Sequence, residues 1–211
     1  MKRALTLALM VCCLAVLLAG CKQQPAPQPV PQPTAEQYFQ YGMQAFQQEN
    51  YPQAQAQFEA AVQLAPAMAD AHYYLGLCYF KQNMLRRAEQ SFAACLQLVP
   101  GHVLAHEALG LLYYAMNDFP RAKREFEQAA ALYSVNAQVY YYLGAIAMSE
   151  NRCKDALGYY KRCLEIDSSL VQVRTEYDAA KRRCAGGKPA PQPKPATSFQ
   201  GGAKALDPAN F

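Results

Sequence analysis

Two histidines four residues apart are the most obvious candidates for metal ligands in this chain. On one helix, His102 and His106 would lie one turn apart on the same side, a spacing that suits two imidazole ligands of zinc. However, His106 occupies the same place in a 34-residue repeat as Tyr38, His72 and Tyr140, and His102 precedes the helix that holds His106. We therefore expect no metal site and no cofactor.

Other signatures of catalysis are also missing from the sequence. It contains no nucleophile elbow, no phosphate-cradling glycine loop and no convergent pair of carboxylates. The tyrosine runs 73–74 and 140–142 alternate between core and partner-facing positions of a helix, so they need no chemistry to explain them. The sequence predicts a protein that is not an enzyme.

Four glycines spaced 34 residues apart organise the middle of the chain: Gly42, Gly76, Gly110 and Gly144. Each glycine is followed by an alanine, then an aromatic residue, then a small residue, at constant distances. These positions hold Ala54, Ala88, Ala122 and Ala156; Phe58, Phe92, Phe126 and Tyr160; and Ala61, Cys95, Ala129 and Cys163. A fixed period of this length is typical of stacked repeats.

Each repeat contains two segments with apolar residues at helical spacing. We expect the break between the paired helices near Asn50, Asn83, Asn117 and Asn151. We expect successive pairs to be separated at Pro66 and Pro100, because a proline ends the helix before it. Each repeat is then a helical hairpin that cannot bury its own apolar face, and stacking four of them creates one continuous core.

The second repeat carries Tyr74-Leu75-Gly76 and Tyr79 on its first helix, then Ala88, Phe92, Cys95, Leu98 and Pro100. This motif resembles the tetratricopeptide repeat family. The resemblance implies an all-α fold, an α-solenoid of four hairpins over residues 35–68, 69–102, 103–136 and 137–170, with a C-terminal capping helix over 171–184. The departures are Ala45 and Ala147 in place of an aromatic residue, and Ser134 and Ser168 in place of the proline that ends a hairpin.

In this family the first helix of each hairpin lines a concave groove. Carried onto this sequence, the groove positions are Phe39, Met43, Phe46, Tyr73, Leu77, Phe80, Glu107, Leu111, Tyr114, Tyr141 and Met148. Members that clamp a C-terminal carboxylate use Lys and Asn where this chain has Phe39 and Met43, so that activity is not expected. An aromatic and Met-lined groove suits an apolar helix or extended segment of a protein partner. The alternative is that a segment of this chain or a second copy fills it.

The first residues read as a secretory signal. Lys2 and Arg3 precede an apolar run over 4–19 that is shorter than the roughly 18 residues of a spanning helix. The run ends in Leu18-Ala19-Gly20-Cys21, which resembles the bacterial lipobox and implies cleavage after residue 20 and lipidation of Cys21. An ordinary signal peptide or an uncleaved anchor is the alternative. Lys22 after the cysteine points to the outer membrane.

Proline-rich segments flank the predicted repeats. Residues 21–33 form a spacer with alternating prolines, and residues 185–211 form a tail rich in proline and glycine that we expect to be disordered. Loss of Lys2 and Arg3 with the signal lowers the net charge from +4 to +2, which argues against a nucleic-acid partner. The positive charges are concentrated in the later repeats. We expect most of them to lie on solvent-exposed faces of helices; the alternative is that they bind an acidic partner.

Five cysteines remain after the signal and Cys21 are set aside: Cys78, Cys95, Cys153, Cys163 and Cys184. Cys153 and Cys163 would lie about 15 Å apart on one helix, too far to bond. Cys184 ends the capping helix, which should lie beside the turn before Cys153. We therefore expect a Cys153–Cys184 disulfide, with buried free thiols at Cys95 and Cys163.

The sequence thus predicts a membrane-anchored periplasmic scaffold that binds a protein partner in cell-envelope assembly, in secretion or type IV pilus biogenesis. The overall plan resembles pilotin-type lipoproteins, and other envelope lipoproteins with these repeats equally well. The alternative is an accessory lipoprotein that recruits peptidoglycan or polysaccharide enzymes.

Overall fold

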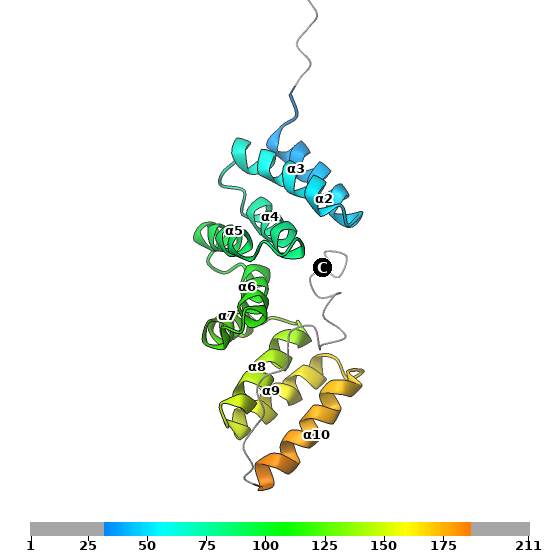
Figure 1. The fold of residues 1–211 in the computed structure, drawn as a ribbon, viewed down its shortest axis with the longest axis vertical. Helices are drawn as coiled ribbons and strands as arrows, with labels where there is room; N and C mark the ends of the chain where they lie inside the picture. Colours follow the sequence, from blue (N-terminus) through cyan, green and yellow to red (C-terminus); the bar gives the residue numbers. More distant parts are fainter. Residues whose placement is uncertain (1–31, 187–211) are drawn as a thin grey trace, which may run out of the picture. The chain divides into compact units, whose positions relative to one another are not determined.

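The computed structural model describes residues 32–186, which form nine α-helices and no strand within that range (Figure 1). The predicted signal peptide, Cys21, nearly all of the spacer and residues 187–211 lie outside the described residues. None of the described helices is both long and apolar enough to cross a bilayer.

The helices are arranged as four hairpins followed by one further helix. They are α2 (Ala35–Gln47) and α3 (Tyr51–Leu64), α4 (Ala69–Lys81) and α5 (Leu85–Leu98), α6 (Val103–Ala115) and α7 (Phe119–Ala131), α8 (Ala137–Ser149) and α9 (Cys153–Ile166), and α10 (Val171–Gly186). Each helix packs against its hairpin partner, and the second helix of each hairpin packs against the element that follows it. This arrangement confirms the expected all-α solenoid. The last helix continues two residues past the expected end at residue 184.

Local sequence signals set the helix boundaries. Thr34 begins α2 with a capping box, in which the Thr34 side chain and the Gln37 side chain each bond the other's backbone N–H. The turn inside each hairpin contains one residue with positive φ, at Glu49, Asn83, Asn117 and Asn151, which are themselves spaced 34 residues apart. Asparagine tolerates this left-handed conformation better than most residues, which explains three of the four turns.

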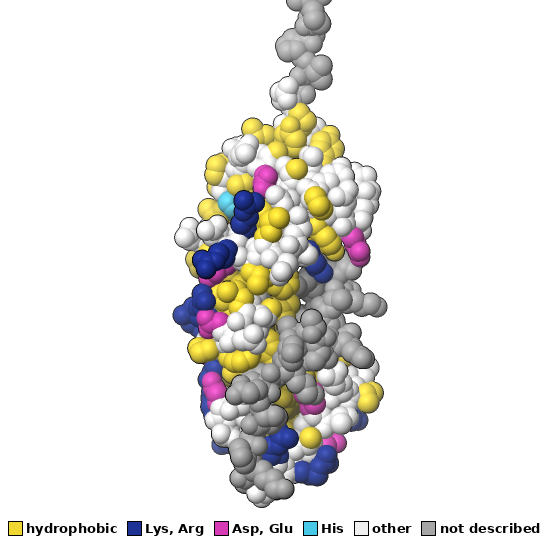
Figure 2. All heavy atoms as spheres, in the orientation of Figure 1, with side chains coloured by type: hydrophobic (Ala, Val, Ile, Leu, Met, Phe, Trp, Pro, Cys, Tyr) yellow, Lys and Arg dark blue, Asp and Glu magenta, His cyan; other side chains and the backbone are white. Residues whose placement is uncertain are grey.

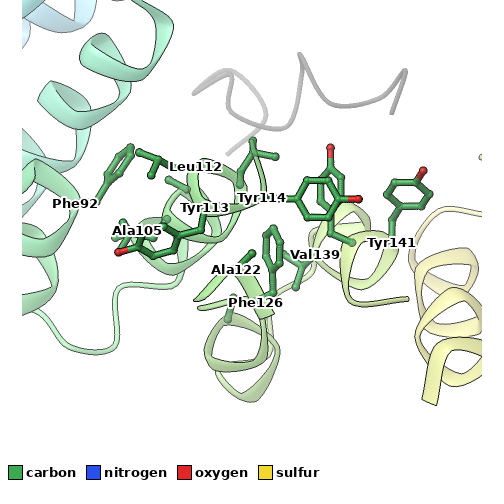
Figure 3. Close-up of a cluster of buried hydrophobic side chains, with 14 of the residues drawn as sticks. Phe92, Ala105, Leu112, Tyr113, Tyr114, Ala122, Phe126, Val139 and Tyr141 are labelled. Carbon is green, nitrogen blue, oxygen red and sulfur yellow. The ribbon is translucent and has the colours of Figure 1, made fainter. Parts of the chain in front are cut away.

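The glycine in each first helix lies against the aromatic residue of its partner helix. A Cβ atom at Gly76 would lie 2.6 Å from ring atoms of Phe92, and one at Gly110 would lie 2.5 Å from the ring of Phe126. Gly42 meets Phe58, and Gly144 meets Tyr160, in the same way. The glycine therefore sets how closely the two helices approach, and the ring fills the space between them. Figure 3 shows Phe126 beside Ala122 and Val139, within a core that continues from one hairpin to the next.

A buried ion pair joins the start of α6 to α7. The Nδ1 atom of His106 donates to Glu125 at 2.9 Å, and its Nε2 atom donates to the carbonyl oxygen of Pro100 at 3.0 Å. The hydrogen bond to Glu125 raises the pKa of His106, against the opposing effect of burial. Burial by itself would raise the pKa of Glu125, but hydrogen bonds from His106 and Arg124 lower it below its ordinary value. The arrangement favours a protonated His106.

A disulfide fixes the last helix. Cys153, the first residue of α9, is bonded to Cys184 of α10, with their Cα atoms 5.8 Å apart. This is the pair that the sequence analysis selected. Val173 and Ala180 form the buried side of α10, which packs against α9. The last helix is therefore held to the fourth hairpin by both packing and a covalent bond.

Replacing Gly76 by Ala should destabilise the fold by about 1–3 kcal/mol, because the buried ring of Phe92 has no space to move aside. Gly158→Ala is the matched control, since a Cβ there meets nothing within 4 Å. That change should leave stability unchanged or raise it by about 0.5–1 kcal/mol. Urea unfolding followed by circular dichroism measures both. Equal stability of the two variants would contradict the close-approach role of the glycine.

The His106–Glu125 pair should make stability depend on pH. Because the pKa of His106 is higher folded than its ordinary value of 6.5, its stabilisation is complete below that value and is lost as pH rises through the folded-state pKa. Glu125, with a lowered pKa, adds stability above its ordinary value of 4.5 that is lost in acid.

Urea unfolding from about pH 5.5 to 8.5 should show this loss in the parent chain and not in His106→Gln. His72→Gln is the control, because His72 contacts the carbonyl oxygen of Pro66 and no carboxylate. An unchanged pH slope in His106→Gln would refute the role of the pair.

Candidate partner-binding face

The eleven predicted partner-binding residues lie on the first helices of the four hairpins, α2, α4, α6 and α8. Within a helix they are spaced by three or four residues, or by seven, as in Phe39, Met43 and Phe46, so they share one side. We call the surface formed by these eleven residues the first-helix face.

The first-helix face is not uniformly exposed. Phe39, Met43 and Phe80 are half-buried, and the other eight residues are buried. The side chains accessible to a partner therefore lie on α2 and α4. Leu77, which shares the face with Phe80, is only 1 % exposed and belongs to the core.

Contacts between aromatic rings bury some positions of the first-helix face. Phe46 packs against Tyr51 and Tyr74, and Tyr74 stacks on Phe58 with ring centroids 5.6 Å apart. An equivalent four-ring cluster recurs 68 residues later, made of Tyr114, Phe119, Phe126 and Tyr142. In each cluster the tyrosine of the following hairpin covers the aromatic residue near the end of the preceding first helix.

The middle junction lacks that ring. Phe80 corresponds to Phe46 and Tyr114, but the residue that corresponds to Tyr74 and Tyr142 is Ala108. An alanine cannot cover the ring, and Phe80 is half-buried while Phe46 and Tyr114 are 5 % and 1 % exposed. Phe80 was expected in the groove on the same footing as its counterparts, and the difference becomes visible in the sequence when the repeats are compared at position 108.

Glu107, the one charged residue of the face, is engaged inside the fold. Its carboxylate accepts hydrogen bonds from Ser134 and from Asn136, both in the connection between α7 and α8. Burial raises the pKa of Glu107, and the two hydrogen bonds partly oppose that rise. Glu107 thus holds a connection in which Ser134 replaces the proline of other repeats, and it is not free to meet a partner.

The residues that could support catalysis are also engaged. The imidazole of His106 is held by Glu125 and Pro100, while His102 caps α6 by accepting from the backbone N–H of Ala105. Burial raises the pKa of the three free thiols, Cys78, Cys95 and Cys163, to about 12, so they stay protonated and unreactive near neutral pH. Within residues 32–186 no group of three or more His, Cys, Asp or Glu side chains could hold a metal ion.

Basic side chains on the second helices mostly serve the stack itself. Arg121 lies over the ring of Tyr113, 4.3 Å from its centroid, and pairs with Glu89 and Asp118. Lys123 pairs with Glu150 across two hairpins. In Figure 2 the Lys and Arg side chains gather along the edge where α5 and α7 lie, interspersed with acidic ones. These pairs connect neighbouring repeats.

Many solved structures are similar to the chain in fold, including the following three. The structure titled as the functional characterisation of Pseudomonas aeruginosa pilF matches with a TM-score of 0.60 at 20% identity, covering 73% of this chain and 76% of that one. PilW, described as a widely conserved type IV pilus biogenesis factor, matches with a TM-score of 0.61 at 19% identity, covering 72% and 70%. MamA matches with a TM-score of 0.63 at 18% identity, covering 82% and 90%.

A comparison with curated protein sequences finds no match. The tetratricopeptide repeat family, in contrast, matches residues 42–103 and 107–170, two segments that each begin within a first helix and together cover more than half of the sequence. With the helical hairpins, the glycine–aromatic contacts and this match, the chain belongs to the tetratricopeptide repeat family.

Proposed function

We propose that this chain is a lipid-anchored adaptor of the bacterial cell envelope that binds a protein segment on its first-helix face and does not catalyse a reaction. The observation that supports the proposal is the half-buried part of that face, Phe39, Met43 and Phe80, on a scaffold whose remaining eight face residues are buried. Aromatic and methionine side chains supply apolar contact area that adapts to a helix or an extended segment.

The likeness in fold to PilW favours assembly of a pilus or secretion apparatus as the pathway. The lipobox-like residues 18–21 support anchoring, since two or more acyl chains hold a protein stably on a bilayer. Anchoring would raise the concentration of the face at the membrane, where the partner is assembled. The role of such a protein is to collect and position its partner.

Phe80→Glu should abolish capture of the envelope proteins that crosslink to the native chain, because a carboxylate would replace the apolar contact. Tyr133→Glu is the control: Tyr133 is exposed and lies in the connection between α7 and α8, outside the first-helix face. Quantitative mass spectrometry of crosslinked envelopes compares the two variants. Equal capture by both would move the binding site elsewhere, and capture only of cell-wall synthases would replace the pilus or secretion pathway.

Cys21→Ser should release the chain from the membrane fraction, because the thiol that accepts the lipid is then missing. Fractionation of envelopes, with mass spectrometry of the mature N-terminal peptide, measures this. Cys78→Ser is the control, since Cys78 is a buried thiol of α4 and should leave the distribution unchanged. A variant at Cys21 that stays in the membrane would contradict lipid anchoring.

A further inference from the structure

The middle junction of the solenoid is two aromatic rings short of its neighbours: Leu85 stands where Tyr51 and Phe119 do, and Ala108 stands where Tyr74 and Tyr142 do. At the first and third junctions, Tyr74 and Tyr142 complete a four-ring cluster, with Tyr142 and Tyr114 only 4.4 Å apart between ring centroids. At the middle junction Ala108 stands in that place, so the following hairpin offers no ring at this position to the half-buried Phe80. A ring supplied from elsewhere would take the place that Tyr74 and Tyr142 fill at the other two junctions.

We infer that the missing ring is supplied by the chain's own C-terminal segment, residues 187–211, which binds across α4 and α6 with an aromatic side chain against Phe80. This inference rests on the proposed function because it concerns the same face. A partner that binds this face must then displace the C-terminal segment. We therefore expect the partner to present an aromatic side chain of its own.

The segment has the composition and the length for this position. Its aromatic residues are Phe199 and Phe211, which follow Gly186 of α10 by 13 and 25 positions. Fully extended, these stretches reach roughly 45 and 85 Å. Packed helices lie about 8–10 Å apart, and α9, α8, α7 and α6 separate α10 from α4, so the distance along the stack is roughly 40–50 Å. The stretch to Phe211 spans this distance with slack, and the stretch to Phe199 reaches it only when nearly fully extended.

Charge favours the same placement. Residues 32–81, which end with α4, contain Glu36, Glu49, Glu59 and Asp70 against one basic residue, Lys81, whereas residues 187–211 contain Lys188, Lys194 and Lys204 against Asp207. Asp70 lies at the start of α4, and its side chain is 68 % exposed. A basic segment is thus attracted to the N-terminal part of the solenoid, which includes α4.

The test titrates a synthetic peptide of residues 187–211 into a chain that ends at Gly186, followed by isothermal calorimetry. That shortened chain keeps every described helix and the Cys153–Cys184 disulfide, and circular dichroism checks its fold. We expect the peptide to bind. A peptide with Phe199→Ala and Phe211→Ala should bind at least about tenfold more weakly, because it loses both rings.

Variants of the shortened chain locate the site. Ala108→Tyr, which supplies the ring from within the chain, should abolish peptide binding, and Ala131→Tyr on the exposed end of α7 is its matched control. Should Ala108→Tyr fail to fold, Phe80→Ala provides the second variant, with an expected loss of about tenfold.

Lack of peptide binding, or binding that neither the phenylalanine changes nor Phe80→Ala weaken, would overturn the inference. These measurements use no partner, so their outcome is separate from that of the proposed function. If the peptide does not bind but capture of envelope proteins still depends on Phe80, the inference is refuted and the proposed adaptor role stands.

Discussion

The contact between a glycine and an aromatic ring inside each hairpin is the constraint on which the rest of the structure depends. Because no Cβ atom separates the two helices at Gly42, Gly76, Gly110 and Gly144, the ring of the second helix reaches the backbone of the first. Four identical close approaches give four hairpins of the same geometry, and hairpins of the same geometry stack in a constant register. That register places one side of α2, α4, α6 and α8 in a single face.

Above this 34-residue period, the aromatic packing has a period of two repeats. Tyr74 and Tyr142 join the first hairpin to the second and the third to the fourth through matching clusters, while Ala108 leaves the middle junction without its ring. The same substitution that weakens aromatic packing there leaves Phe80 accessible. The proposed binding site thus lies where the repeat departs from its own pattern.

The hairpins, their turns and the pairing of Cys153 with Cys184 could be predicted from the sequence, because helical spacing and a strict period determine which residues face each other. Exposure along the first-helix face was not predicted, although the alanine at position 108 is visible in the sequence. The sequence interpretation gave each repeat position one environment and so treated Phe80 as equivalent to Phe46 and Tyr114, although those two are buried and Phe80 is half-buried. The role of Glu107 was missed because its partners, Ser134 and Asn136, lie 27 and 29 residues away.

The most direct measurement of the central claim is photocrosslinking in the native envelope with a benzoylphenylalanine placed at position 80. A matched probe at position 135, where Val135 is exposed in the connection between α7 and α8, serves for comparison. The account predicts that the probe at position 80 crosslinks a defined protein segment that the probe at position 135 does not reach. Identical crosslinked species from both positions would contradict a binding site on the first-helix face.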